Sequence, residues 1–329
     1  MSKASTTIRH SSFGICHFKG GRLMKVAVVG AGAMGSLFGA MLAEAGNEVW
    51  LYDVWLEHVQ TINQTGLQIE REGSTRTIKV RATADPQQIG RAELVIIFVK
   101  ASRTNSAAET AQFIAGSDGS VMTLQNGMGN ADVIAEFIDS EQILAGTTSH
   151  GATLLGPGSI RHAGCGPTTI GAWSQTEAGR QRAGQLAEFF SRAGIETESV
   201  ADVRSVVWNK LLINIGINAI TALTNIKNGQ ILDLEITREL SRTAVKEAIN
   251  VAQAANIEAL DDAIDRVFKV AEATAVNRSS MGQDVDNRRP TEIAAINGFI
   301  VREAKRLGLE APVNLALTAL VQTLEYHYK

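Results

Sequence analysis

Cysteine is scarce in this chain of 329 residues, which holds only Cys16 and Cys165. Two cysteines are too few for a disulfide framework, so we expect a reducing, cytoplasmic compartment. Long apolar runs are missing too, since none reaches the roughly 18 residues of a membrane span. The formal net charge of -3 gives no basic field that would favour nucleic acid. We therefore expect a soluble globular protein with no nucleic-acid and no membrane partner.

The chain is longer than a typical single domain, so two domains are expected. Residues 1–23 stand apart from the rest. They are rich in Ser and Thr, contain basic but no acidic residues, and superficially look like a transit peptide. They lack the apolar core of a secretory signal. We expect an extension ahead of the folded part, either disordered or an artefact of the assigned gene start.

Short β-branched runs alternate with helical patterns in the first half of the chain. The clearest strand, at 25–29, leads into a glycine-rich turn and then a helix that stops at Gly46. Further strands are expected at 48–53, 93–100, 120–126 and 142–152. This alternation predicts an α/β fold with a Rossmann-like, doubly wound parallel sheet.

The pattern changes from residue 153 onward. Turn residues between short alternating runs predict a β-hairpin or antiparallel extension at the sheet edge, followed by a helix at 177–192 and a strand at 195–200. Beyond Ala201 the expected elements are helices at 203–223, 233–256, 261–277, 291–307 and 312–327. We therefore predict a dinucleotide-binding domain over 24–200. An all-α domain over 201–329 would supply substrate-binding and catalytic residues.

The segment GAGAMG has GxGxxG spacing, follows a strand and opens a helix. In that setting the first glycine permits a tight turn, the second lets a pyrophosphate approach, and the third lets helix and strand pack closely. Amides at the helix start can then hold the phosphates. We expect a dinucleotide here, and a tight turn without a ligand is the alternative. The residues concerned are Gly30, Ala31, Gly32, Ala33, Met34 and Gly35.

Three polar residues end expected strands. Asp53 stands where a carboxylate hydrogen-bonds the adenosine ribose and repels a 2′-phosphate, so it favours NAD over NADP. Its alternative role is to cap the next helix. Lys100 and Asn126 end two later strands, at the sheet edge where open α/β folds bind ligands. Either could be an ordinary solvated or turn residue, but their shared position favours a site.

Three further polar residues, Lys210, Asn214 and Asn218, interrupt an apolar helical pattern at intervals of four. Since an α-helix advances about 100° per residue, they form one polar stripe. A buried polar group without a partner costs roughly 1–3 kcal/mol, so the stripe needs partners in neighbouring helices or in a substrate. A desolvated lysine is suited to donate a proton near neutral pH. Ser280 and Glu292 precede a later apolar helix, where capping is the alternative role.

Together these residues make the chain resemble the ketopantoate reductase (2-dehydropantoate 2-reductase) family. The resemblance covers the chain from Met24 onward. It implies a Rossmann-like domain joined to an all-helical domain, with the active site between them. The implied reaction reduces ketopantoate, a 2-keto acid, to pantoate with hydride from NAD(P)H, for pantothenate biosynthesis. The matching motifs, in chain order, are GAGAMG, VKA, QNGMG, GTTSHGA, WNKLLINIGINAITALTN, NG at 228–229, SSMGQD and RPTEIAAINGFIV.

The resemblance also implies roles for single residues. Lys210 corresponds to the catalytic lysine, which donates the proton, and Glu292 orients it or the substrate. The implied substrate contacts are Asn126, Asn214, Asn218, Asn228 and Ser280. Outside the glycine-rich turn, the implied cofactor contacts are Lys100, Asn126, Ala152 and Glu292.

One feature departs from the family. Ketopantoate reductases usually take NADPH, often with a basic residue just after the second strand, whereas here Asp53 is followed by Val54 and Trp55. NADP is thus expected from the resemblance and NAD from local chemistry. No metal is expected, and a homodimer is left open. The rival functions are a reductase of another branched 2-keto acid or lactone and a non-catalytic dinucleotide-sensing protein.

Overall fold

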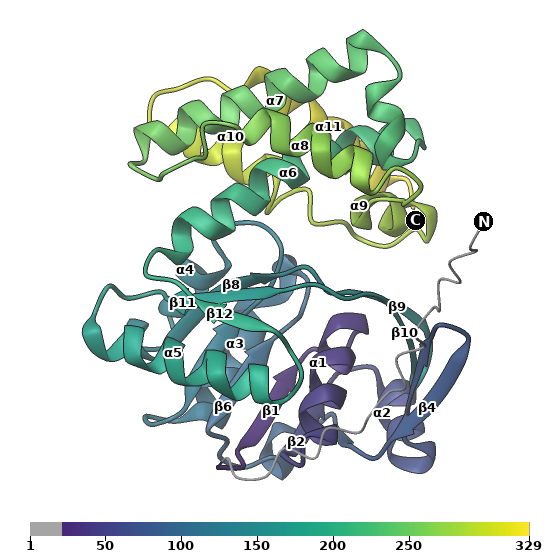
Figure 1. Ribbon diagram of the computed structural model, residues 1–329, viewed down its shortest axis with the longest axis vertical. Coiled ribbons are helices and arrows are strands. Elements are labelled where there is room, and N and C mark those ends of the chain that lie inside the picture. The colour runs from purple at the N-terminus through teal and green to yellow at the C-terminus, as the bar shows by residue number, and fades with distance from the viewer. Residues whose placement is uncertain (1–21, 329) are drawn as a thin grey trace, which may run out of the picture.

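The computed structural model describes residues 22–328, so the expected extension at 1–23 lies outside the described residues except for its last two positions. Every strand of this range belongs to an α/β part that ends with strand β12, Thr197–Ser199. A helical part begins with helix α6, Val203–Thr224, and is stacked on the α/β part (Figure 1). The change from strands to helices thus falls close to the expected position near residue 200.

The main sheet has eight strands in the order β12-β11-β8-β7-β6-β1-β2-β5. All neighbouring strands are parallel except β8 and β11, which are antiparallel. The expected parallel sheet with an antiparallel extension is therefore confirmed. Its strands before β12 are β1 Lys25–Val29, β2 Glu48–Tyr52, β5 Arg81–Thr83, β6 Leu94–Ile97, β7 Ser120–Thr123, β8 Ile143–Thr148 and β11 Thr168–Ala172.

Helices cover both faces of this sheet. Along β1, Val26 and Val28 pack in one apolar cluster with residues of α1 and α5, whereas Ala27 and Val29 pack in another with residues of α3 and α4. A strand buried on both faces reads as a continuous apolar run, as this one does. The sheet is therefore doubly wound. The helices of the α/β part are α1 Ala33–Glu44, α2 Leu56–Thr65, α3 Thr104–Ala115, α4 Asn130–Ala135 and α5 Glu177–Arg192.

A second sheet of four strands was not predicted. Its order is β4-β3-β10-β9. It includes the β3–β4 hairpin, where no strand was expected from the sequence. The strand expected at 142–152 is wrong as a single element, because the chain turns after Thr148 and β9 enters the second sheet. The expected hairpin exists as β9–β10, but in this sheet. The strands are β3 Leu67–Arg71, β4 Ser74–Ile78, β9 Gly151–Gly156 and β10 Ser159–Gly164.

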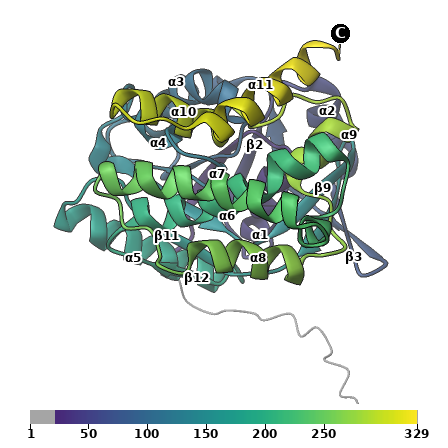
Figure 2. The ribbon, with the colours of Figure 1, turned by 90° about the horizontal axis from the view of Figure 1, so that it is seen from above.

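Helix α6 is the central element of the helical part. It packs against α7, α8, α9 and α11, and Figure 2 shows these helices from above. By length and composition α6 could cross a membrane, but 67% of its most apolar stretch is buried inside the protein, as in a core helix. The elements after it are the 3-10 helix η4 Asn228–Leu232, α7 Glu235–Ala254, α8 Ala263–Ala273, α9 Ser280–Asp286, α10 Asn297–Arg306 and α11 Pro312–Tyr326.

The helix expected at 291–307 begins only at Asn297, so its first six residues were predicted wrongly. Residues 292–296 form turns, and the backbone of Ile296 is far from helical, with φ -102° and ψ -97°. Here the loop after β7 docks against the helical part: the Met128 amide donates to the Ala295 carbonyl at 3.2 Å. A Cβ on Gly127 would lie 2.4 Å from that carbonyl oxygen, so only glycine permits this approach.

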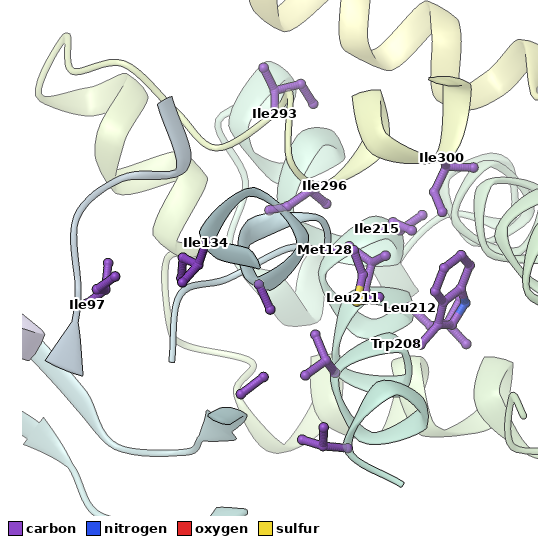
Figure 3. Close-up of a cluster of buried hydrophobic side chains, with 14 of the residues drawn as sticks. Ile97, Met128, Ile134, Trp208, Leu211, Leu212, Ile215, Ile293, Ile296 and Ile300 are labelled. Carbon is purple, nitrogen blue, oxygen red and sulfur yellow. The ribbon is translucent and has the colours of Figure 1, made fainter. Parts of the chain in front are cut away.

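One buried apolar cluster continues across the two parts (Figure 3). Met128, from the loop after β7, belongs to the same cluster as Trp208, Leu211 and Leu212 of α6 and Ile296 of the turn before α10. Close packing of this kind resists sliding of one element past another. The carboxyl end of β7 therefore has a fixed position relative to α6.

Candidate active site

The three glycines of the turn after β1 have different surroundings. Gly30 has φ +96°, and a Cβ there would lie 2.8 Å from the backbone nitrogen of Val99. A Cβ on Gly35 would lie 2.0 Å from the carbonyl oxygen of Gly30. Within the described residues, a Cβ on Gly32 would meet no heavy atom inside 4 Å. The fold thus requires Gly30 and Gly35, whereas Gly32 faces open space that a ligand could use.

The start of α1 has the properties of an anion site. Gly32 is the N-cap, and no side chain caps the helix. The Ser36 amide donates to the Gly32 carbonyl, so the amides of Ala33, Met34 and Gly35 precede the first turn of hydrogen bonds. Such amides, at the positive end of the helix dipole, bind phosphates. The turn therefore fits the pyrophosphate of a dinucleotide.

Asp53 links this turn to the end of β2. Its Oδ2 accepts the amide of Ala31 at 2.8 Å, and its Oδ1 accepts the amide of Trp55 at 2.9 Å. Asp53 thus does cap the turn into α2, although the N-cap of that helix is Trp55. The Ala31 amide, which we expected to face the cofactor, is already paired. A half-buried carboxylate held in this way remains at the position where a ribose would bind.

Five polar residues meet where β6 and β7 end against the helical part. Asn126 Nδ2 donates to Glu292 Oε2 at 3.1 Å. Lys100 Nζ lies 2.5 Å from Asp284 Oδ2 of α9. Burial raises the pKa of Glu292, opposed by the charge of Lys100, the Asn126 hydrogen bond and the charge of Lys210. The structure therefore brings together Lys100, Asn126, Lys210 and Glu292.

Lys210 connects α6 to the end of β8. Its Nζ donates to the carbonyl oxygen of Thr148 at 3.0 Å. Burial lowers the pKa of Lys210 to about 8, and the negative charge of Glu292 opposes this shift. An ammonium group with this pKa is protonated at neutral pH and releases its proton more readily than an ordinary lysine. The site thus holds an acid suited to proton transfer.

Asn214 and Asn218 follow Lys210 on α6 at one and two turns, over a distance of about 12 Å. Asn214 is half-buried and Asn218 is buried. No side-chain hydrogen bond joins either amide to another residue of the 22–328 range. The stripe is therefore not satisfied by neighbouring helices, which was the alternative considered from sequence.

Ser280 lies near the far end of this stripe. Its neighbour Ser279 caps α9 and lies within hydrogen-bond distance of Thr221 of α6, with 2.7 Å between the two hydroxyl oxygens. Ser280 itself is exposed as the first residue of α9. Ser279 therefore caps α9, and the Ser280 hydroxyl remains available to another partner.

Asn228 and Ala152 lie on the border of this region. Asn228 is buried at the start of η4, where its amide nitrogen donates to Thr274 Oγ1 at 3.0 Å. Its Oδ1 atom is buried and has no partner within the described residues. Ala152 pairs with His162 across the β9–β10 hairpin, four residues after Thr148. Within residues 22–328, neither residue forms a hydrogen bond or ion pair with Lys210 or Glu292.

Two contributors were missed from sequence. Asp284 lies in the SSMGQD motif, but no local pattern distinguishes a pairing acid from a solvated one. Burial raises the pKa of Asp284, opposed by the charge of Lys100. The Thr148 carbonyl is a backbone group, so it has no signature in the sequence beyond its place in GTTSHGA.

One sizeable hollow lies elsewhere. It has a volume of about 610 Å³ and is lined by Met24, Glu93 and Ser120, which stand at the amino ends of β1, β6 and β7. Open α/β sheets bind ligands outside the carboxyl ends of their strands. This hollow is therefore not the candidate active site.

The glycine-rich turn, the doubly wound sheet and the half-buried lysine beside a buried carboxylate define a dinucleotide-dependent oxidoreductase. The chain belongs to the ketopantoate reductase family. Residues 26–175 match the family model "Ketopantoate reductase PanE/ApbA", and residues 202–325 match "Ketopantoate reductase PanE/ApbA C terminal".

Relatives match over nearly the whole chain. The 2-dehydropantoate 2-reductase of Halobacterium salinarum is 38% identical over 301 residues, 91% of this chain and 98% of the relative. That of Pyrococcus abyssi is 36% identical over 304 residues, 92% of this chain and 98% of the relative.

Solved structures match as well. A ketopantoate reductase from Ralstonia eutropha is 35% identical with a TM-score of 0.85, over 93% of this chain and 99% of that one. D-mandelate dehydrogenase, solved with NADH and anilino(oxo)acetate, is 31% identical with a TM-score of 0.86, over the same shares of 93% and 99%. The resemblance inferred from the motifs is confirmed.

Proposed function

We propose that this protein is a 2-dehydropantoate 2-reductase, which reduces ketopantoate to pantoate with NAD(P)H. The observation that carries the proposal is the position of Lys210. Its ammonium group donates to the Thr148 carbonyl at the end of β8, and the charge of Glu292 acts on its pKa. Asn126, just after β7, donates a hydrogen bond to the same Glu292. The product serves pantothenate biosynthesis, and the cytoplasm is the compartment we propose.

The chain's own residues explain how the ketone would be reduced. A reduced nicotinamide, when bound, supplies the hydride that converts the C2 ketone into an alcohol. Lys210 uses one of its three hydrogens on Thr148, which leaves two for the ketone oxygen. It stabilises the negative charge that develops there and then supplies the proton. The carboxylate of Glu292, held by Asn126, favours the charged form of Lys210.

The remaining polar residues would hold the substrate. The amides of Asn214 and Asn218 and the hydroxyl of Ser280 offer donors for its carboxylate and its hydroxyl group. We assign Asn228 to the same task from the resemblance. Residues 24–200 then act as the cofactor-binding domain, and residues 201–329 as the domain that supplies the proton and grips the keto acid.

A panel of 2-keto acids tests this function. We expect kcat/KM for ketopantoate to exceed that for other branched 2-keto acids, and for the keto acid of mandelate, by at least tenfold. The last compound belongs in the panel because of the similarity to D-mandelate dehydrogenase. A kcat/KM at least tenfold higher for another keto acid would identify that acid, and not ketopantoate, as the substrate. Cofactor binding without turnover of any member would favour the dinucleotide-sensing alternative.

The cofactor preference depends on Asp53. We infer that NADH is preferred, because a carboxylate held at the ribose position repels a 2′-phosphate; NADPH is the expectation from the family. Substitution of Asp53 by asparagine keeps an acceptor for the Ala31 amide and removes the charge. We expect Asp53→Asn to raise the NADPH:NADH ratio of kcat/KM by about tenfold, equivalent to ~1.4 kcal/mol. Asp53→Ala removes both acceptors of the Ala31 and Trp55 amides, whereas Asp53→Asn keeps one, so the larger loss of stability is expected for Asp53→Ala. An unchanged ratio in Asp53→Asn would exclude Asp53 as the discriminator.

A further inference from the structure

Three metal-binding side chains meet outside the proposed active site. His150 lies in the turn between β8 and β9, His162 in β10, and Cys165 just beyond β10. His150 Nδ1 is 3.2 Å from His162 Nε2, and Cys165 Sγ is 3.4 Å from the same Nε2 atom. All three ligand atoms lie within 4.8 Å of one another. We propose that His150, His162 and Cys165 form a binding site for a zinc ion.

The spacing fits tetrahedral coordination. Zinc binds nitrogen at about 2.0–2.1 Å and thiolate sulfur at about 2.3 Å, so two nitrogen ligands lie about 3.3 Å apart and a nitrogen and a sulfur about 3.6 Å apart. The two measured distances differ from these values by a few tenths of an ångström at most. The separation between His150 and Cys165, which is at most 4.8 Å, has to close by up to about 1.2 Å. Two imidazoles and one thiolate are also a ligand set that zinc prefers over calcium or magnesium.

The backbone holds the ligands in advance. His162 is paired with Ala152 of β9, and the register shifts between His162 and Gly164. Such a bulge changes the direction of the side chains that follow it, which here include Cys165. The ring of His150 packs edge-on against Phe38, with 5.8 Å between ring centroids. A site that exists before the metal arrives binds it with a smaller loss of conformational freedom.

The exposure of the three side chains suits a bound ion with one open position. His162 is buried, His150 is half-buried and Cys165 is exposed, so an ion can enter from solvent on the cysteine side. Burial lowers the pKa of both histidines, which favours the neutral imidazoles that bind metals, whereas the nearby positive charge of Arg71 works against a cation. Three protein ligands leave a fourth position for water.

No metal was expected from the sequence. His150 and His162 are brought together by the β9–β10 hairpin, which the sequence placed only at the edge of the main sheet. The proposed site lies two residues after Thr148, the residue whose carbonyl binds Lys210. Metal binding would therefore stiffen the turn that follows the Lys210 contact.

Metal titration of the full-length, chelator-treated protein tests the site. We expect one equivalent of Zn²⁺ per chain by mass spectrometry of the metal content, and a higher Tm with zinc than without. Co²⁺ should give the intense visible bands of a tetrahedral site and a thiolate-to-cobalt charge-transfer band. Cys165→Ser should abolish that band, and His150→Ala should weaken Zn²⁺ binding by at least tenfold.

Cys16→Ser is the matched control, since Cys16 is the only other thiol of the chain, and it should bind both metals as the wild type does. His150 and Cys165 are the ligands to replace first because neither is fully buried, and circular dichroism checks that each variant is folded. Binding below one tenth of an equivalent in the wild type would overturn the proposal. So would binding that is unchanged in both Cys165→Ser and His150→Ala, and the short contacts would then be hydrogen bonds alone.

Discussion

Replacement of Lys210 by alanine should lower kcat/KM for ketopantoate by roughly three orders of magnitude or more. The variant loses both the proton donor and the positive charge beside the ketone oxygen, and each such contribution is worth about 10²-fold or more. The dissociation constant of the cofactor should change by less than about threefold. The glycine-rich turn that fits the pyrophosphate belongs to the start of α1, whereas Lys210 lies on α6. Steady-state kinetics and fluorescence titration with the reduced cofactor measure the two quantities.

The pH profile provides a second readout of the same role. Burial lowers the pKa of Lys210 to about 8, and the reaction needs its protonated form. In the wild type, kcat/KM for reduction should therefore be constant below that pKa and fall as the pH rises through it. This fall should be absent from the residual activity of Lys210→Ala. Lys246→Ala, which replaces an exposed lysine of α7, should leave activity and profile unchanged.

Near-normal turnover in Lys210→Ala would exclude Lys210 as the proton donor. A large loss with an unchanged pH profile would point instead to a role in positioning, with the titrating group elsewhere. Glu292 would then be the next candidate, because it shares the electrostatic environment of Lys210 and is buried.

The main sheet could be predicted because its strands are buried. Nearly continuous apolar runs form β1, β6 and β7, so the residue types alone predict that these strands are buried. β4 could not be found in the same way, since only its last residue, Ile78, is buried. The sequence of β4 carries no apolar alternation, and pairing with β3 decides its structure. Similarly, the docking of Met128 on Ala295 overrides the helical pattern of residues 292–296.

The candidate site was predictable to the extent that its residues have fixed local positions. Lys100 and Asn126 follow strands, and Lys210 interrupts an apolar helix, so each is visible in its own segment. The ion pair between Lys100 and Asp284 joins residues 184 positions apart, so the local sequence around either residue does not predict it. The unpaired amides of Asn214 and Asn218 are also a property of the folded chain, because only the packed neighbours show that no helix satisfies them.

The glycine-rich turn allows stability and cofactor binding to be separated. Gly32→Ala should leave the Tm within about 1 °C of the wild-type value, because its φ of -62° suits any residue and its Cβ would meet no described atom within 4 Å. The added methyl group would stand in the space through which the pyrophosphate reaches the backbone. We expect the cofactor to bind about 100-fold more weakly, a loss of ~2.7 kcal/mol.

Gly35→Ala is the matched variant with the opposite expectation. Its Cβ would lie 2.0 Å from the Gly30 carbonyl oxygen, so the turn has to move and the protein should lose about 1–3 kcal/mol of stability. Thermal unfolding and fluorescence titration of both variants measure the two effects. If Gly32→Ala binds the cofactor as the wild type does, the open space at Gly32 is not the pyrophosphate site. If it loses stability to the same extent as Gly35→Ala, weaker binding would reflect a distorted turn rather than a blocked one.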